Sequence, residues 1–186
     1  MHGGRRRFVT AAAAVGASAL AGCSSLTGGG GNDERTVTAT EPNDDGKGTP
    51  GELRYLIETK QGEGDIAIPL SKFVTGTGSA DGEEFTYATV TYDSQAVEHD
   101  SKSARNTRFV EEIGVFARSY AIYVDADGDV TDFNVNVENR YDGQPKRFGI
   151  QRKWAHKYNS GEKDQEWYVN AIASTFQYPS TTTDTS

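Results

Sequence analysis

The sequence predicts an α+β domain, in which an antiparallel sheet of about four strands carries a long helix and shorter helices on one face. Residues 109–124 place apolar side chains at the i, i+3, i+4 and i+7 spacing of an amphipathic helix. Residues 66–93 and 132–151 lie on either side of this helix and are rich in alternating or β-branched side chains, as strands are. Two pairs of strands separated by one long helix favour two hairpins in one sheet, with the helices packed on one face.

The domain is expected to begin with a short helix near Thr49. Thr49 can cap the helix, Pro50 suits its first position, and Glu52 completes a capping box. Leu53 and Leu56 then start an apolar stripe. The pattern predicts a short amphipathic helix with a defined first turn.

The first hairpin is expected between this helix and the long one. Residues 66–70 alternate in the manner of a strand, and Pro69 among them lacks an N–H group, which favours a position at the sheet edge. Residues 76–82 are rich in glycine and predict a loop. Residues 83–93 are β-branched and aromatic, so they predict the second strand.

The second hairpin follows the long helix. Residues 132–138 alternate between polar and apolar side chains, which predicts a half-exposed strand. The Asp-Gly pair at 142–143 is a hairpin turn signal, and residues 146–151 return as the fourth strand. Two short helices are expected after it, one around Trp154 and one around Trp167.

Residues 1–22 have the pattern of a twin-arginine signal peptide. Arg5 and Arg6 are followed, after one residue, by an apolar pair that begins with Phe8. Residues 9–21 are rich in alanine and fit the central region of a signal peptide, because they are too short and too weakly apolar to span a bilayer. Twin-arginine signals direct proteins to a dedicated translocase, which is the expected partner during export.

The next four residues resemble the lipobox of exported lipoproteins. They are Leu20, Ala21, Gly22 and Cys23. Small residues before the cysteine let a peptidase bind the extended backbone, and the thiol is needed because a thioether joins it to a diacylglycerol. Two acyl chains give stable attachment to a membrane. We therefore expect the mature protein to begin at Cys23 and to be anchored by lipid at the outer face of the cytoplasmic membrane.

Composition divides the mature chain into three parts. Residues 23–48 are rich in Gly, Thr, Asp and Asn, so they predict a flexible tether between the lipid and the domain. The α+β domain is expected over residues 49–178, and residues 179–186 are expected to be a disordered tail. Because Cys23 is the one cysteine of the sequence, the domain has no intramolecular disulfide bond.

The chain is acidic. Its 186 residues carry a formal net charge of −8, from 27 acidic and 19 basic side chains. Removal of residues 1–22 takes away three arginines and no acid, so the mature charge is 16 − 27 = −11. Such a surface repels phosphates, so a nucleic-acid partner is not expected. The excess of acidic residues also favours a salt-adapted source, because a charged surface stays hydrated and soluble.

A resemblance to known proteins supports this source. The twin-arginine pattern, the lipobox and the Gly/Thr/Asp-rich tether together resemble those of haloarchaeal lipoproteins. Residues 109–115, 154–161 and 168–169 and the strand near Val130 resemble an uncharacterised α+β domain found in such proteins, over about residues 50–178. The resemblance implies export and a cell-surface location. It implies no activity, since its motifs consist of packing and capping residues.

Histidines suited to catalysis are few. His2 leaves with the signal peptide, His99 lies in a polar stretch, and His156 lies on a predicted helix. A serine hydrolase needs a nucleophile, a base and an acid brought together, and no Gly-x-Ser-x-Gly motif occurs. Two histidines without further cysteines also make a poor zinc site. Neither histidine is therefore assigned a catalytic role, and no cofactor other than calcium is considered.

Two pairs of acidic residues are adjacent in the sequence. They are Glu83 with Glu84 and Glu111 with Glu112. Adjacent side chains point apart on a helix or a strand, so these acids are expected on solvated faces and not as an acid/base pair. Arg108 lies four residues before Glu112 and is expected to pair with it on the outer face of the long helix.

One acidic loop has a pattern that can bind calcium. Asp125, Asp127 and Asp129 alternate around a glycine, and carboxylates in a tight loop can converge on a hard cation. The loop departs from an EF-hand, which would have glycine in place of Val130 and glutamate in place of Asn136. The alternative is an acidic turn between a helix and a strand, since Asp and Gly are common turn residues.

Three functions stay open from the sequence. A lipid-anchored, non-catalytic binding or interaction module is favoured, and Tyr141, Tyr158 and Tyr178 are candidates for its binding surface or for packing at the core rim. An extracellular hydrolase would require His99 or His156 packed against an acid and a serine. A small solute-binding accessory protein is the third possibility, although one domain is short for the two-lobed form of such proteins.

Overall fold

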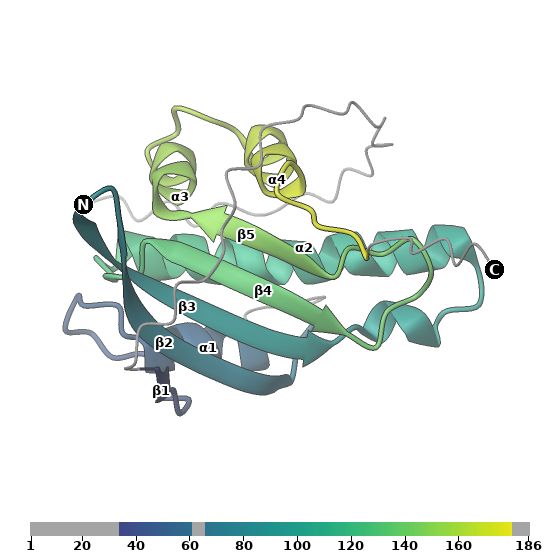
Figure 1. Ribbon diagram of the computed structural model, residues 1–186, viewed down its shortest axis with the longest axis horizontal. Helices are drawn as coiled ribbons and strands as arrows, with labels where there is room; N and C mark the ends of the chain where they lie inside the picture. Colours follow the sequence, from purple (N-terminus) through teal and green to yellow (C-terminus); the bar gives the residue numbers. More distant parts are fainter. Residues whose placement is uncertain (1–33, 61–65, 180–186) are drawn as a thin grey trace.

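A mixed sheet of five strands, in the order β1–β2–β3–β4–β5, forms the centre of the structure (Figure 1). The computed structural model describes residues 34–60 and 66–179. The strands are β1 (Arg35–Thr36), β2 (Leu70–Ala80), β3 (Glu83–Asp93), β4 (Asp132–Glu138) and β5 (Arg147–Gln151). Neighbouring strands are antiparallel except for β3 and β4, which are parallel.

Four α-helices and one 3₁₀ helix accompany the sheet within the described ranges. They are α1 (Pro50–Glu58), the 3₁₀ helix η1 (Gln95–Glu98), α2 (Lys102–Asp125), α3 (Arg152–Asn159) and α4 (Gln165–Ala173). Helices α1 and α2 lie behind the sheet in the view of Figure 1, whereas α3 and α4 lie beyond the β5 edge. Both of these short helices contact α2 and β5. No helix in the described ranges is long and apolar enough to cross a membrane.

The predicted α+β class is confirmed, but the prediction of an entirely antiparallel sheet is wrong. Helix α2 has 24 residues and is therefore about 36 Å long, which matches the roughly 36 Å of the 11-residue strand β3. The helix returns the chain to the end at which β3 begins, so β4 enters the sheet beside β3 in the same direction. The sheet thus joins two hairpins through a parallel central pair.

Strand β2 lies where the sequence predicted a loop. It includes most of the expected loop at 76–82, and the turn to β3 consists of Asp81 and Gly82 alone. Both residues have positive φ, of 55° and 85°, as a tight two-residue hairpin turn requires. The Asp-Gly pair was therefore the turn signal, and the glycines before it belong to the strand.

Two of these glycines lie under aromatic rings of the neighbouring strand. Gly76 pairs with Tyr87 and Gly78 pairs with Phe85. A Cβ atom at Gly76 would lie 2.6 Å from the Tyr87 hydroxyl oxygen, and one at Gly78 would lie 2.6 Å from the Phe85 ring. The two rings therefore lie across β2. An aromatic ring from a neighbouring strand restores the packing that a glycine in a strand lacks.

The capping box at the start of α1 is confirmed. The Thr49 backbone N–H donates to Glu52 Oε2 at 2.7 Å, and the Glu52 backbone N–H donates to Thr49 Oγ1 at 3.3 Å. Two donors of the first turn are thus satisfied by the reciprocal pair.

The domain begins earlier than the expected boundary at residue 49. Strand β1 pairs with β2, and Val37 is buried. The Arg54 guanidinium donates to the Val37 carbonyl at 2.6 Å, and the Asn43 backbone N–H donates to Glu52 Oε1 at 3.0 Å. Residues 35–48, which composition assigned to the tether, are therefore part of the folded domain. Residues 23–33 lie outside the described ranges.

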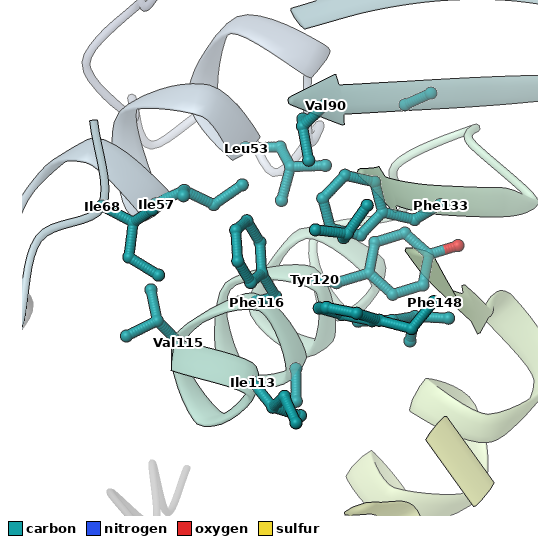
Figure 2. Close-up of a cluster of buried hydrophobic side chains, with 14 of the residues drawn as sticks. Leu53, Ile57, Ile68, Val90, Ile113, Val115, Phe116, Tyr120, Phe133 and Phe148 are labelled. Atoms are coloured by element: carbon teal, nitrogen blue, oxygen red, sulfur yellow. The ribbon is translucent and has the colours of Figure 1, made fainter. Parts of the chain in front are cut away.

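The core lies between the sheet and α2. Figure 2 shows Phe116 and Tyr120 of α2 beside Phe133 of β4 and Phe148 of β5. The ring of Phe116 lies 5.8 Å from that of Phe148, and the ring of Tyr120 lies 5.2 Å from that of Phe133, measured between centroids. These side chains are at most 1% exposed, so one face of the sheet is committed to packing.

Candidate functional site

The face of the sheet opposite α1 and α2 carries polar side chains from strands β3, β4 and β5. Side chains alternate along a strand, so Ala88, Val90 and Tyr92 enter the core while the residues between them point away from it. We call this second surface the open face, because the helices that cover the core lie on the other side (Figure 1). Its residues are Tyr87, Thr89, Thr91, Asp132, Asn134, Asn136, Arg147, Gly149 and Gln151.

A small pocket lies on the open face between β4 and β5. It has a volume of about 20 Å³, which is enough for one group the size of a water molecule. Phe133 and Ile150 contribute to its wall, although their side chains are buried in the core. Gly149 lines the pocket, and a Cβ atom there would lie at an ordinary contact distance of 3.8 Å from Asn134 Oδ1. The lining residues are Asp132, Phe133, Asn134, Gly149, Ile150, Gln151 and Thr175.

Three polar side chains of this pocket have no partner within the described part of the chain. Gln151 Oε1 is buried and accepts no hydrogen bond. Asp132 and Asn134 form no side-chain hydrogen bond or ion pair with other described residues. Burial raises the pKa of Asp132, and the positive charge of Lys153 opposes this shift. The wall of the pocket is mainly apolar, and Gln151 Oε1 is buried beneath it.

Strand register brings these groups together. Asp132 pairs with Tyr87 on one side and with Gln151 on the other, so the three residues form a row across the open face. Asn134 pairs with Gly149 in the next row. The ring of Tyr87 lies over Gly76 of β2.

A second polar cluster is buried at the other end of β3. The carboxylate of Glu112 is fully buried and accepts hydrogen bonds from the Tyr92 hydroxyl at 2.9 Å, the Ser94 hydroxyl at 2.9 Å and the Ala96 backbone N–H at 3.1 Å. The Gln144 amide donates to Ser94 Oγ at 2.8 Å. These contacts join β3, η1, α2 and the β4–β5 connection, so the cluster fixes the fold and is closed to a ligand.

The prediction that Glu112 is solvated and pairs with Arg108 is wrong. Arg108 instead forms an ion pair with Glu111 at 3.1 Å. Burial raises the pKa of Glu112, and the hydrogen bonds from Ser94 and Tyr92 oppose the shift. Glu111 is exposed, as expected.

The aspartate loop is held by protein groups. Arg152 donates to the Gly128 carbonyl and, at 3.2 Å, to Asp127 Oδ1. The Tyr123 hydroxyl donates to Asp129 Oδ1 at 2.8 Å. Within the described residues, no three or more His, Cys, Asp or Glu side chains are grouped to hold a metal. Calcium binding at Asp125, Asp127 and Asp129 stays a prediction.

The two histidines of the domain lie apart from the pocket. His156 is exposed on α3, and its Nε2 accepts a hydrogen bond from Arg152 Nε at 3.2 Å. His99 is exposed after η1, where its backbone carbonyl accepts from Arg105 at 2.6 Å. The hydrolase hypothesis requires one of them to be packed against an acid and a serine. In the described part of the chain, neither histidine forms a hydrogen bond with an acid or a serine.

The three candidate tyrosines occupy different environments. Tyr141 packs against the core and donates to Asn106 Oδ1 at 2.8 Å, while Tyr158 stacks on Tyr168 with 5.2 Å between ring centroids. Tyr178 is 55% exposed. None of the three lines the pocket.

The predicted export and lipidation residues lie outside the described ranges. They are Arg5, Arg6, Phe8, Leu20, Ala21, Gly22 and Cys23.

Sequence reasoning did not identify the pocket. The alternation in 132–138 indicated that Asp132 and Asn134 lie on the exposed side of a strand. It gave no register, so it could not place Gln151 beside Asp132.

Comparison with known proteins gives a family and no activity. No curated protein and no solved structure matches the chain. The profile of one family matches residues 79–182, which is more than half of the chain and extends from the end of β2 through α4. By this match, the chain belongs to the family described as a domain of unknown function (DUF8159).

Proposed function

We propose that this protein is an exported lipoprotein whose domain is a non-catalytic binding module at the outer face of the cytoplasmic membrane. The observation that carries the binding role is the pocket on the open face, where Asp132, Asn134 and Gln151 have no partner within the described residues. Gln151 Oε1 is buried, whereas the polar atoms of Asp132 and Asn134 reach the surface of the open face, where a ligand can replace their water.

Binding is favoured over catalysis by the chemistry of the lining residues. Thr175 supplies the one hydroxyl among them, and its Oγ1 is already bonded to the Gly149 backbone N–H at 2.8 Å and to the Ile172 carbonyl at 2.6 Å. A nucleophile needs a free lone pair and an adjacent base. The carboxylate and amides that remain are suited to hydrogen-bond and charge recognition.

The lipid anchor is supported by the lipobox and by its distance from the domain. Cys23 lies 12 residues before Arg35, the first residue of β1 (35 − 23 = 12). Fully extended, this segment would span at most about 40 Å. A domain attached in this way stays close to the membrane surface while its open face can meet a ligand.

Fractionation of cells that express Cys23→Ser tests the anchor. We expect the wild-type protein in the membrane fraction and the variant in the medium, or retained as uncleaved precursor. Ser24→Ala is the matched control and should fractionate like the wild type. Retention of mature Cys23→Ser in the membrane fraction, at the level of the wild type, would contradict lipid anchoring.

A further inference from the structure

Two aromatic side chains lie on the open face and outside the core. Phe85 and Tyr87 are alternate residues of β3, so both point away from α2, and neither belongs to the hydrophobic core. Their ring centroids are 6.4 Å apart, with an angle of 52° between the ring planes. Each ring lies over a glycine of β2, and each residue is half-buried. One side of each ring therefore rests on the β2 backbone, and the other side is available to a ligand.

Uncharged polar side chains continue the open face beside the two rings. Strand register places Thr89 next to Asn134 and Thr91 next to Asn136. In the described part of the chain, none of these four side chains forms a hydrogen bond. We call the four residues, together with the two rings, the uncharged strip.

The polar ends of the uncharged strip reach the surface. Two side-chain atoms of the described residues are buried without a hydrogen bond, and they are Arg108 Nε and Gln151 Oε1. The hydroxyl and amide groups of the strip are not among them, so their free donors and acceptors face solvent. A ligand can therefore replace the water on these groups while the hydrogen bonds of the fold stay intact.

Charge and hydrogen-bonding capacity indicate the kind of ligand. The strip has no charge, although the chain carries a formal net charge of −8. Asp132 and Arg147 lie beside it, the first paired with Tyr87 and the second with Asn136. The acidic chain repels anions, and the strip itself offers no carboxylate to a cation. Hydroxyl and amide groups both donate and accept, so they complement a neutral ligand rich in hydroxyl groups.

Two other kinds of occupant fit the open face less well. A polypeptide adds to a sheet at its edge, because the backbone groups inside a sheet already bond to the neighbouring strands. A second copy of this chain would pack sheet on sheet through apolar side chains, whereas the open face is mostly polar.

We infer that the open face binds a neutral oligosaccharide chain. The apolar C–H surface of a pyranose ring stacks on Tyr87 or Phe85, and the sugar hydroxyl groups exchange hydrogen bonds with Thr89, Asn134 and Asn136. The inference rests on the proposed binding function and specifies the class of its ligand.

Titration calorimetry of the full-length chain with defined oligosaccharides tests this inference. The chain is kept in micelles of a polyoxyethylene alkyl ether, because a detergent with a sugar headgroup would compete. The neutral probes are cellohexaose, maltohexaose, mannohexaose and chitohexaose, and hexagalacturonic acid is the anionic probe. We expect a neutral probe to bind at least about tenfold more tightly than the anionic one, which the acidic surface repels. Its affinity should change less than about twofold between low and high potassium chloride, because salt screens only interactions between charges.

Two results of this titration would overturn the inference. One is the absence of binding by all four neutral probes. The other is binding of the anionic probe that equals or exceeds the binding of every neutral probe.

Substitutions locate the binding on the uncharged strip. Tyr87→Leu removes the stacking surface and should lower affinity about tenfold, whereas Tyr87→Phe keeps the ring and should stay within about threefold of the wild type. Asn136→Ala removes a half-buried amide and should lower affinity about threefold to tenfold. Tyr55→Leu is the matched control, because Tyr55 is a half-buried tyrosine on α1, behind the sheet, and affinity should not change (Figure 1). Thermal melting checks that each variant is folded, and undiminished affinity in both Tyr87→Leu and Asn136→Ala would overturn the assignment to this face.

Chromatography of the oligosaccharide after titration separates this inference from the proposed function. We expect the bound probe to keep its length. Shortened products would support a glycan ligand and contradict the non-catalytic role. Binding of hexagalacturonic acid alone would leave a binding module and overturn the neutral ligand, while the fractionation of Cys23→Ser reports on the anchor alone.

Discussion

Replacement of Glu112 by alanine should destabilise the domain more than any replacement of an exposed acid. The carboxylate receives three hydrogen bonds, from the hydroxyls of Tyr92 and Ser94 and from the Ala96 backbone N–H. Each buried donor left without an acceptor costs about 1–3 kcal/mol, and removal of the buried charge returns part of this cost. We therefore expect Glu112→Ala to lower the free energy of unfolding by about 3–5 kcal/mol.

Chemical denaturation and thermal melting measure this loss. For a domain of this size, 3–5 kcal/mol corresponds to a fall in melting temperature of roughly 6–20 °C. Glu111→Ala is the matched control, because Glu111 is the exposed neighbour and forms only a surface ion pair with Arg108. It should cost less than about 1 kcal/mol. Equal losses for the two variants would refute the view that Glu112 is the centre of a buried network.

The pH dependence of stability gives an independent check on Glu112. Burial raises its pKa in the folded state above the value in the unfolded chain. Such a carboxyl contributes most to the free energy of unfolding when it is protonated. This contribution is therefore full below about pH 4.3 and falls as pH rises through the folded-state pKa. The stability of the wild type relative to Glu112→Gln should therefore decrease over that window as pH rises. An increase over the same window would contradict the sign of the shift.

Two other predictions concern glycines and calcium. Gly114→Ala on α2 should stabilise the domain by about 0.5–1 kcal/mol, since nothing lies within 4 Å of the added Cβ atom. Gly76→Ala should destabilise the domain by about 1–3 kcal/mol, because the added Cβ atom would lie 2.6 Å from the Tyr87 hydroxyl oxygen. Equal effects of the two substitutions in urea titrations would contradict this packing. If residues 125–129 bind calcium, isothermal titration at millimolar calcium should release or absorb heat and the melting temperature should rise, and the absence of both effects would remove the prediction.

Local sequence rules predicted the parts of the fold that depend on local contacts. The capping box of Thr49 and Glu52 is an interaction between residues three positions apart, and it forms as expected. The register of apolar residues also contained the information that Glu112 is buried, because it lies three residues after Phe109 and four before Phe116 on the same helical stripe. A charged residue on an apolar stripe is better interpreted as a buried hydrogen-bonding group than as a solvated one.

The features that were missed depend on contacts between strands. Gly76 and Gly78 resemble loop residues until Tyr87 and Phe85 are placed opposite them. The parallel pairing of β3 and β4 likewise depends on where α2 returns the chain, which side-chain periodicity does not encode.

The pocket depends on the same kind of information. Asp132, Asn134 and Gln151 are polar positions on two different strands, and only the pairing of β4 with β5 makes them neighbours. Gly149 pairs with Asn134 in this register, although its position in the sequence suggests no more than a weak point in a strand.

The membrane fraction of cells that express Cys23→Ser tests most directly whether a lipid on this cysteine anchors the protein. The account predicts that the mature variant leaves the membrane fraction while the wild type stays in it. Mature Cys23→Ser in the membrane fraction at the level of the wild type would contradict the account.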